Sequence, residues 1–182
     1  MDHADHVALL RDGVPRAGPD NALWADLGSG TGAFTLALAD LLGPAGRIVS
    51  VDRDASALRQ QAAAMATRFP KIVLDQRVAD FTRDLGLPPL DGIVMANALH
   101  FQRDRRAAVE HVRAMLRPGG RLVLVEYDAD RGNPWVPYPL SFETWRHVAV
   151  EAGFGDPRLL GRVPSRFLGA IYSALALRPD AG

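Results

Sequence analysis

A glycine-rich turn carries the strongest chemical signal in this sequence. Its glycines alternate with other residues at Gly28, Gly30 and Gly32, Ser29 lies between the first two, and Asp26 precedes them by two positions. Glycine lets the backbone approach a ligand where a Cβ would collide, and it accepts a positive φ. A carboxylate beside such a turn suits a cationic ligand group better than a pyrophosphate. The pattern therefore predicts a ligand-binding turn with an acidic neighbour.

The spacing of these glycines separates two classes of nucleotide site. A dinucleotide fingerprint places its third glycine three residues after the second. Here the third glycine follows after two residues, and Ala33 occupies the fingerprint position. We therefore expect a cofactor with an amino acid end and an adenosine end. The competing interpretation is a plain strand-to-helix turn, although alternating glycines after a buried strand are costly without a ligand.

Further acidic side chains follow the second and third predicted strands. Asp52 ends the second strand, where a carboxylate can accept hydrogen bonds from both hydroxyls of a ribose. Alternatively, Asp52 is only a residue at the N-terminus of the next helix. Asp80 ends the third strand, and Phe81 beside it could lie near a bound ring. Arg53 could stack on that ring or remain solvated.

The stretch after the fourth predicted strand contains a candidate base. His100 follows this strand closely, and an imidazole with a near-neutral pKa can take a proton from a hydroxyl or a protonated amine. The alternative is a histidine that packs beneath a loop. Asn97 also ends this strand, and Glu126 and Tyr127 end the fifth. The last two residues could line an acceptor pocket or be ordinary strand-end residues.

These side chains must be brought to one edge of a sheet, and the hydrophobic pattern predicts one. Apolar runs alternate with helical periodicity, which favours right-handed crossovers and a parallel sheet. The predicted strands of this sheet span residues 22–27, 47–51, 71–78, 92–96 and 121–127. The predicted helices span residues 5–11, 31–42, 54–67, 103–116 and 141–152.

Two segments near the end of the chain have turn-like composition. Pro118-Gly119-Gly120 predicts a tight turn into the fifth strand. Pro164-Ser165 separates two strand-like runs, at 157–163 and 167–177, and such a short link predicts an antiparallel hairpin.

The segment from Asp26 to Gly32 resembles the first motif of class I S-adenosylmethionine-dependent methyltransferases. Later stretches match in order, so the resemblance covers residues 20–127. It implies an α/β fold: a Rossmann-like, doubly wound sheet of seven strands, mostly parallel with a C-terminal antiparallel hairpin. The implied organisation is a single methyltransferase domain over 1–182, with a lead-in at 1–20, a cofactor-binding core at 21–127, and a substrate-side loop, helix and hairpin at 128–182.

The resemblance also assigns roles to individual residues. The glycines would pass beneath the methionine end of S-adenosylmethionine, and Asp26 would face its ammonium group. Asp80 would accept from the adenine amino group, while the N–H of Phe81 serves a ring nitrogen. The residues implied in cofactor binding are Asp26, Gly28, Ser29, Gly30, Gly32, Asp52, Arg53, Asp80, Phe81 and Asn97.

Two stretches of the sequence bear on the class of acceptor. DNA-base and glutamine N-methyltransferases carry an Asn/Asp-Pro-Pro-aromatic motif, whereas this chain has Asn97-Ala98-Leu99-His100. The stretch from Leu116 to Arg121 is similar to small-molecule methyltransferases of the ubiquinone-biosynthesis type, those of the type 11 and type 25 families. We therefore expect methyl transfer to a small organic acceptor, with His100 as the catalytic residue.

Three alternatives remain open at this stage. The chain could be a non-catalytic S-adenosylmethionine-binding partner or regulatory subunit, or it could methylate protein. A nicotinamide-dependent oxidoreductase is disfavoured by the glycine spacing and by the lack of a Tyr/Lys catalytic pair.

The amino-acid composition limits the possible binding partners and the cellular location. The 182 residues contain 21 Lys and Arg and 21 Asp and Glu, so the net charge is zero, which argues against a nucleic-acid partner. There is no cysteine, which excludes disulfides and thiolate metal sites, and we expect no metal. The polar N-terminus does not resemble a signal peptide, and no apolar run has membrane-spanning length. We expect a cytoplasmic protein without a membrane partner, for which a homodimer is possible.

Overall fold

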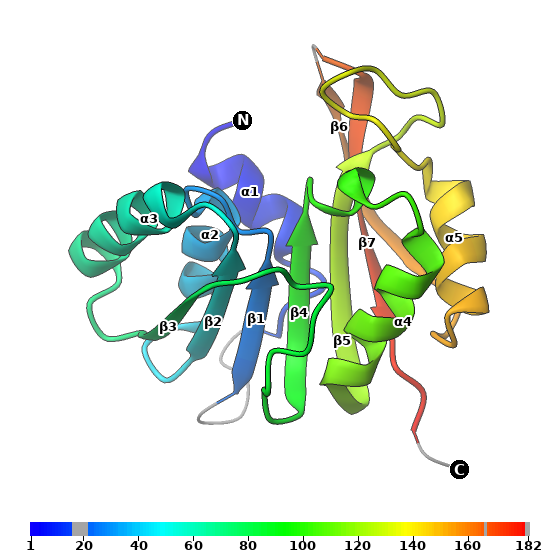
Figure 1. The fold of residues 1–182 in the computed structure, drawn as a ribbon. Helices are drawn as coiled ribbons and strands as arrows, with labels where there is room; N and C mark the ends of the chain where they lie inside the picture. Colours follow the sequence, from blue (N-terminus) through cyan, green and yellow to red (C-terminus); the bar gives the residue numbers. More distant parts are fainter. Residues whose placement is uncertain (16–21, 166, 181–182) are drawn as a thin grey trace.

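A computed structural model describes residues 1–15, 22–165 and 167–180 of the chain. One sheet of seven strands organises the molecule, in the spatial order β3-β2-β1-β4-β5-β7-β6 (Figure 1). The strands are β1 (Leu23–Leu27), β2 (Arg47–Asp52), β3 (Val73–Val78), β4 (Leu90–Ala96), β5 (Leu116–Tyr127), β6 (Arg158–Ser165) and β7 (Gly169–Leu177). The first five strands are parallel, whereas β7 runs antiparallel to both β5 and β6. This confirms the predicted Rossmann-like fold and its C-terminal antiparallel hairpin.

The strand order places a switch point beside β1. The chain runs outward from β1 to β3, then crosses back so that β4 pairs with the other side of β1. Ligands of open α/β sheets bind outside the carboxyl ends of the strands at such a point. The topology therefore predicts the location of the site independently of any motif.

Helices cover both faces of the sheet, and each face has its own apolar core. One core packs α4 (Arg105–Met115) and α5 (Phe142–Glu151) against the sheet, and Trp145 is fully buried there. The other packs α1 (His3–Leu10), α2 (Ala33–Leu42) and α3 (Ala55–Arg68) against the opposite face (Figure 1). Because both faces are covered, the central strands β1, β4 and β5 are nearly continuous apolar runs.

The helices begin at capping residues that the sequence supplies. Asp54 accepts hydrogen bonds from the N–H groups of Ser56 and Ala57 at the start of α3, and Ser141 accepts from Thr144 at the start of α5. Asp and Ser are typical residues for this position, because a side-chain oxygen satisfies N–H groups that lack an intrahelical partner. A short 3-10 helix, η1 (Leu99–Phe101), follows β4.

Two boundary predictions were wrong. Pro164 and Ser165 do not form the hairpin turn but pair with Ala170 and Gly169 inside β6 and β7. β6 is an edge strand, where a proline leaves fewer partners unsatisfied than it would in a central strand. Residues 167 and 168 lie in the turn of the hairpin, and residue 166 lies outside the described residues.

The fifth strand also differs from its prediction. It begins at Leu116, so that Pro118-Gly119-Gly120 lies within its irregular first part rather than before it. The reason is pairing: Leu116 pairs with Leu90, and Gly119 and Gly120 exchange backbone hydrogen bonds with Arg178.

The predicted division into segments stays a prediction. Part of the lead-in, and its boundary with the core at residues 20 and 21, lie outside the described residues. Among the described helices, none is both long enough and apolar enough to cross a bilayer.

Candidate functional site

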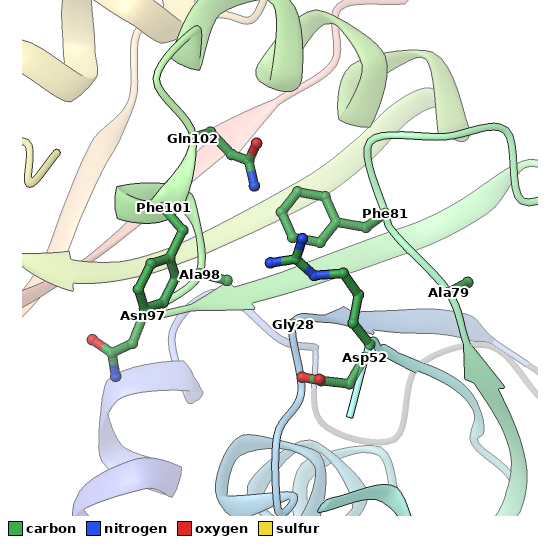
Figure 2. Close-up of a pocket in the computed structure, with 9 residues that line it drawn as sticks. Gly28, Asp52, Ala79, Phe81, Asn97, Ala98, Phe101 and Gln102 are labelled. Atoms are coloured by element: carbon green, nitrogen blue, oxygen red, sulfur yellow. The ribbon is translucent and has the colours of Figure 1, made fainter. Parts of the chain in front are cut away.

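A pocket of about 150 Å³ opens at the carboxyl ends of the strands, where the switch point predicts it (Figure 2). It brings together five residues that the sequence predicted for cofactor binding, namely Gly28, Asp52, Arg53, Phe81 and Asn97. The four other lining residues are Ala79, Ala98, Phe101 and Gln102. Sequence reasoning missed these four, although each lies within five positions of a predicted residue.

The three glycines of the turn are required for two different physical reasons. A Cβ on Gly28 would lie 2.5 Å from the Cβ of Ala98, and one on Gly32 would lie 2.4 Å from Cγ of Gln61. Packing therefore excludes a side chain at both positions. Gly30, with φ +52°, has no atom within 4 Å of its ideal Cβ position. A side chain there would enter open space, which is what a backbone reserved for ligand contact leaves.

Asp52 holds the turn in place. Its Oδ2 accepts the N–H of Gly30 at 2.7 Å, and its Oδ1 accepts the N–H of Asp54 at 2.9 Å. The last residue of β2 thus fastens the glycine turn to the neighbouring strand end. A carboxylate oxygen has more than one lone pair, so both oxygens can still accept from ligand hydroxyls.

Asp26 lies below the turn rather than in the pocket wall. It is 1% exposed, and Thr35 Oγ1 donates to its Oδ2 at 2.5 Å. Burial raises the pKa of Asp26; the Thr35 hydrogen bond lowers it and the charge of Asp52 adds to the rise, so that the pKa is about 7. Gln61 from α3 completes the network by donating to Thr35 at 2.9 Å. The predicted contact of Asp26 with an ammonium group remains a prediction.

Ser29, Gly30 and Gly32 are also outside the pocket lining. The hydroxyl of Ser29 is buried and hydrogen-bonds Ser50 of β2 at 2.7 Å. Gly32 is the N-cap residue of α2 and has a positive φ. Ser29 and Gly32 shape the backbone of the turn in this structure.

Asp80 lies between two pocket-lining residues without lining the pocket itself. Its Oδ1 accepts from the backbone N–H and the hydroxyl of Thr82, at 2.9 and 2.8 Å. These hydrogen bonds lower the pKa of Asp80. Its Oδ2 is 3.9 Å from the guanidinium of Arg53, a side chain that is 73% exposed. The pair is therefore a loose surface contact at the rim of the pocket.

Asn97 has two unusual features. It is the only non-glycine residue with a positive φ, 51°, in the described part of the chain. Its Oδ1 is buried and finds no hydrogen-bond partner among the described residues. Such a strained residue with an unsatisfied oxygen in a pocket wall points to a ligand donor as its missing partner.

His100 forms a buried pair with Glu126. Its Nδ1 is 2.8 Å from Oε2 of Glu126, and its backbone N–H donates to Oε1 at 3.1 Å. The two residues are 2% and 0% exposed. Among the described residues, Nε2 makes no hydrogen bond, so this nitrogen remains available for a proton.

The sequence indicated each residue of this pair but not the pairing. His100 lies shortly after β4 and Glu126 lies near the end of β5, and the parallel register of these strands brings them together. Neither side chain lines the pocket, although Ala98 and Phe101 on either side of His100 do. The phenyl ring of Phe101 lies 4.2 Å from the imidazole, centroid to centroid. Phe101 thus contacts the imidazole and also lines the pocket.

The residues of the pocket fit a sulfonium nucleoside on observations independent of the motif. The backbone at Gly30 leaves open space, Asn97 has an unpaired buried oxygen, and Asp52 offers acceptors. Phe81 adds an aromatic ring to the lining. No group of acidic and histidine side chains in the described ranges could hold a metal ion.

Comparison with protein families agrees with this geometry. A family model described as a methyltransferase domain matches residues 25–122, which is more than half of the chain. The chain belongs to this methyltransferase family. The matched range contains the glycine turn, Asp52, Asp80 and His100, and it ends within β5. The family predicted from the glycine motif is confirmed.

Relatives of this methyltransferase domain include parts of much larger enzymes. A highly reducing polyketide synthase, ACRTS2 from Alternaria alternata, is 37% identical over 75 residues, which is 41% of this chain and 3% of that protein. The chain therefore spans a very small part of that relative.

Solved structures with the same fold cover most of the chain. The CurJ carbon methyltransferase matches with a TM-score of 0.71 and 24% identity, over 89% of this chain and 50% of that one. A 1,6-didemethyltoxoflavin-N1-methyltransferase from Burkholderia thailandensis, solved with bound S-adenosylhomocysteine, matches with a TM-score of 0.74 and 20% identity, over 98% and 78% of the two chains. These likenesses confirm the fold.

Proposed function

We propose that this domain transfers a methyl group from S-adenosylmethionine to a small organic acceptor, and that His100 acts as the base. The observation that carries the proposal is the buried pair of His100 and Glu126, which lies against the pocket-lining residue Phe101. An imidazole held through Nδ1 by a carboxylate can take a proton at its other nitrogen.

The chemistry divides between the cofactor and the chain. S-adenosylmethionine supplies a methyl group already activated on a positively charged sulfur, which leaves as a neutral thioether. Asp52 and the backbone of Gly30 would bind its ribose and methionine parts, and Phe81 and Asp80 would bind its adenine. Holding the acceptor in line supplies much of the acceleration, about 7–11 kcal/mol in favourable cases.

His100 would remove the proton that the acceptor must lose. Nε2 takes this proton, while Glu126 accepts the hydrogen bond from Nδ1–H and stabilises the imidazolium that forms. Burial strengthens this interaction because little water screens it. An acceptor that is already a free nucleophile would need no such pair.

A dedicated base favours an acceptor whose nucleophilic atom is protonated at neutral pH. We propose a carbon flanked by two carbonyl groups, because its proton is acidic enough for an imidazole to remove. The CurJ protein, whose fold this chain shares, is described as a carbon methyltransferase, which supports this choice of atom. A hydroxyl or protonated amine is the alternative acceptor.

Methyl transfer from labelled S-adenosylmethionine tests the proposal. β-Ketoacyl thioesters, phenols and amines would be compared as acceptors, with wild-type protein and with His100→Ala. We expect labelled product from a β-ketoacyl thioester with the wild-type protein and little from the variant. The matched control is His147→Ala, since His147 is exposed on α5. Binding of S-adenosylhomocysteine without turnover on any acceptor would instead indicate a non-catalytic partner subunit.

The proposal includes a location and partners. We propose that the protein acts in the cytoplasm on a small molecule, without a nucleic-acid or membrane partner, and that it can form a homodimer. The balanced charge supports the absence of a nucleic-acid partner, since nucleic-acid sites need an excess of basic residues. Sedimentation with and without S-adenosylhomocysteine would measure the oligomeric state.

A further inference from the structure

The exposed aromatic side chains of the molecule are gathered on one side. In the described residues, the aromatic side chains exposed to solvent are Phe101, Trp135, Tyr138 and Phe167. Phe101 belongs to η1, Trp135 and Tyr138 to the loop between β5 and α5, and Phe167 to the turn between β6 and β7. Single exposed aromatic residues are common, but a contiguous group usually marks a binding surface.

Ring contacts join this group to the buried base. The imidazole of His100 lies 6.0 Å from the ring of Tyr127, and Tyr127 lies 5.8 Å from Phe167, between centroids. Phe167 in turn meets the indole of Trp135 at 6.2 Å with an interplanar angle of 77°. We call Tyr127, Phe167 and Trp135 the aromatic track. It runs from the proposed reacting position to the molecular surface.

The loop that carries Trp135 is held in a defined shape. Asn133 Oδ1 accepts the N–H groups of Trp135 and Val136, both at 2.9 Å, and Val136 is buried. The backbone N–H of Tyr138 donates to the carbonyl of His100 at 3.0 Å. Trp135 is 71% exposed, although the loop that carries it is hydrogen-bonded to His100 through Tyr138. Its exposure therefore does not follow from a loosely attached loop.

We propose that the aromatic track is the acceptor-binding site, and that it takes an uncharged acceptor with an apolar tail. The reacting carbon lies near His100 and the tail rests on Phe167 and Trp135. This inference rests on the proposed function, and it adds the class of acceptor. Uncharged rings in ring-to-ring contact favour apolar chains or flat conjugated groups over ionic ones.

The fluorescence of Trp135 can report whether the aromatic track is covered. Of the tryptophans, Trp24 and Trp145 are 1% and 0% exposed, so Trp135 is the one that a quencher in solution reaches. Acrylamide quenching of tryptophan fluorescence therefore measures whether the track is covered. This measurement needs no turnover, so it separates acceptor binding from catalysis.

The test uses N-acetylcysteamine thioesters of 3-oxobutanoate and 3-oxodecanoate, with S-adenosylhomocysteine present for binding and S-adenosylmethionine for turnover. The long thioester is expected to protect Trp135 from acrylamide, and the short one is expected to protect it much less. Phe167→Ala and Trp135→Ala are expected to raise the KM of the long thioester about tenfold, and to change that of the short one far less. The matched control is Val150→Ala, an exposed apolar residue of α5 outside the track, which should leave both KM values unchanged.

Each other outcome has a defined meaning. Equal effects of Phe167→Ala on both thioesters, with turnover intact, would overturn the track while the proposed function stands. Protection of Trp135 by the long thioester without any methyl transfer would support the track and reject the proposed function. Protection of Trp135 without ligand, increasing with protein concentration, would show that a second copy covers the track and would overturn the proposal.

Discussion

The two sides of the pocket are built by different means. On the β1–β3 side, backbone groups and carboxylates meet directly, as where Asp52 accepts the N–H of Gly30. On the β4–β5 side, side chains from separate elements meet across strands, as His100 and Glu126 do. Both contacts join the ends of neighbouring strands, but the first uses a backbone N–H of the glycine turn, whereas the second joins two side chains.

This difference fits the proposed division of the site, in which the β1–β3 side binds the cofactor and the β4–β5 side binds the acceptor. The cofactor side uses few side chains, so its shape depends on glycines and strand ends. The acceptor side uses large aromatic side chains, which sequence change can exchange without disturbing the sheet. Substitutions on the two sides should therefore affect different measurements.

The largest expected effect is on turnover. His100→Ala should lower the rate of methyl transfer by about 10²–10⁴-fold, because the acceptor proton then lacks a positioned base. Binding of S-adenosylhomocysteine, measured by calorimetry, should not change. Wild-type turnover in this variant would show that His100 is not the base and that its pair with Glu126 has only a structural role.

The next effect concerns stability and pH. The pKa of Asp26 is raised by burial to about 7, so the folded protein retains a proton that the unfolded chain loses above 3.8. Stability from this group is present at low pH and falls as pH rises toward 7, by up to about 1.4 kcal/mol per pH unit.

Asp26→Asn should remove this contribution while still accepting from Thr35. Urea unfolding of both proteins between pH 4 and pH 7 measures the difference. The wild type should lose stability relative to the variant across this range. If the free energies of unfolding of the two proteins change with pH in the same way, Asp26 is ionised when buried.

On the cofactor side, Asp52→Ala should weaken S-adenosylmethionine binding about tenfold or more. The reason is the loss of a charged acceptor, worth about 1.5–3 kcal/mol, together with the anchor of the glycine turn. Calorimetry measures the affinity, and Asp75→Ala, at an exposed carboxylate of β3, is the control. An unchanged affinity would place the ribose elsewhere.

The smallest effects distinguish two glycines of the same turn. Gly32→Ala should lower stability by about 1–3 kcal/mol, because its Cβ would collide with Gln61. Gly30→Ala should cost about 1–2 kcal/mol, from the positive φ alone. Cofactor affinity should nevertheless fall more in Gly30→Ala, because its new methyl group enters the open space beside the turn, which we propose for the cofactor. The reverse order of affinities would contradict the assignment of that space to the cofactor.

The sequence by itself determined the fold family and the position of the glycine turn at the edge of the sheet. Alternation of apolar strands and amphipathic helices predicted the sheet, and Gly28-Ser29-Gly30-Thr31-Gly32 predicted the turn. These features are readable because they are local: a positive φ or a strand end depends on a few adjacent residues. The caps Asp54 and Ser141 were predictable for the same reason.

Only the tertiary structure decided how distant side chains meet. It paired His100 with Glu126, turned Asp26 toward Thr35 beneath the turn, and brought Trp135 against Phe167. It also extended β6 through Pro164, since an edge strand tolerates a proline. Such contacts join residues far apart in the chain through strand register and loop closure, and residue type and spacing do not encode either of these separately.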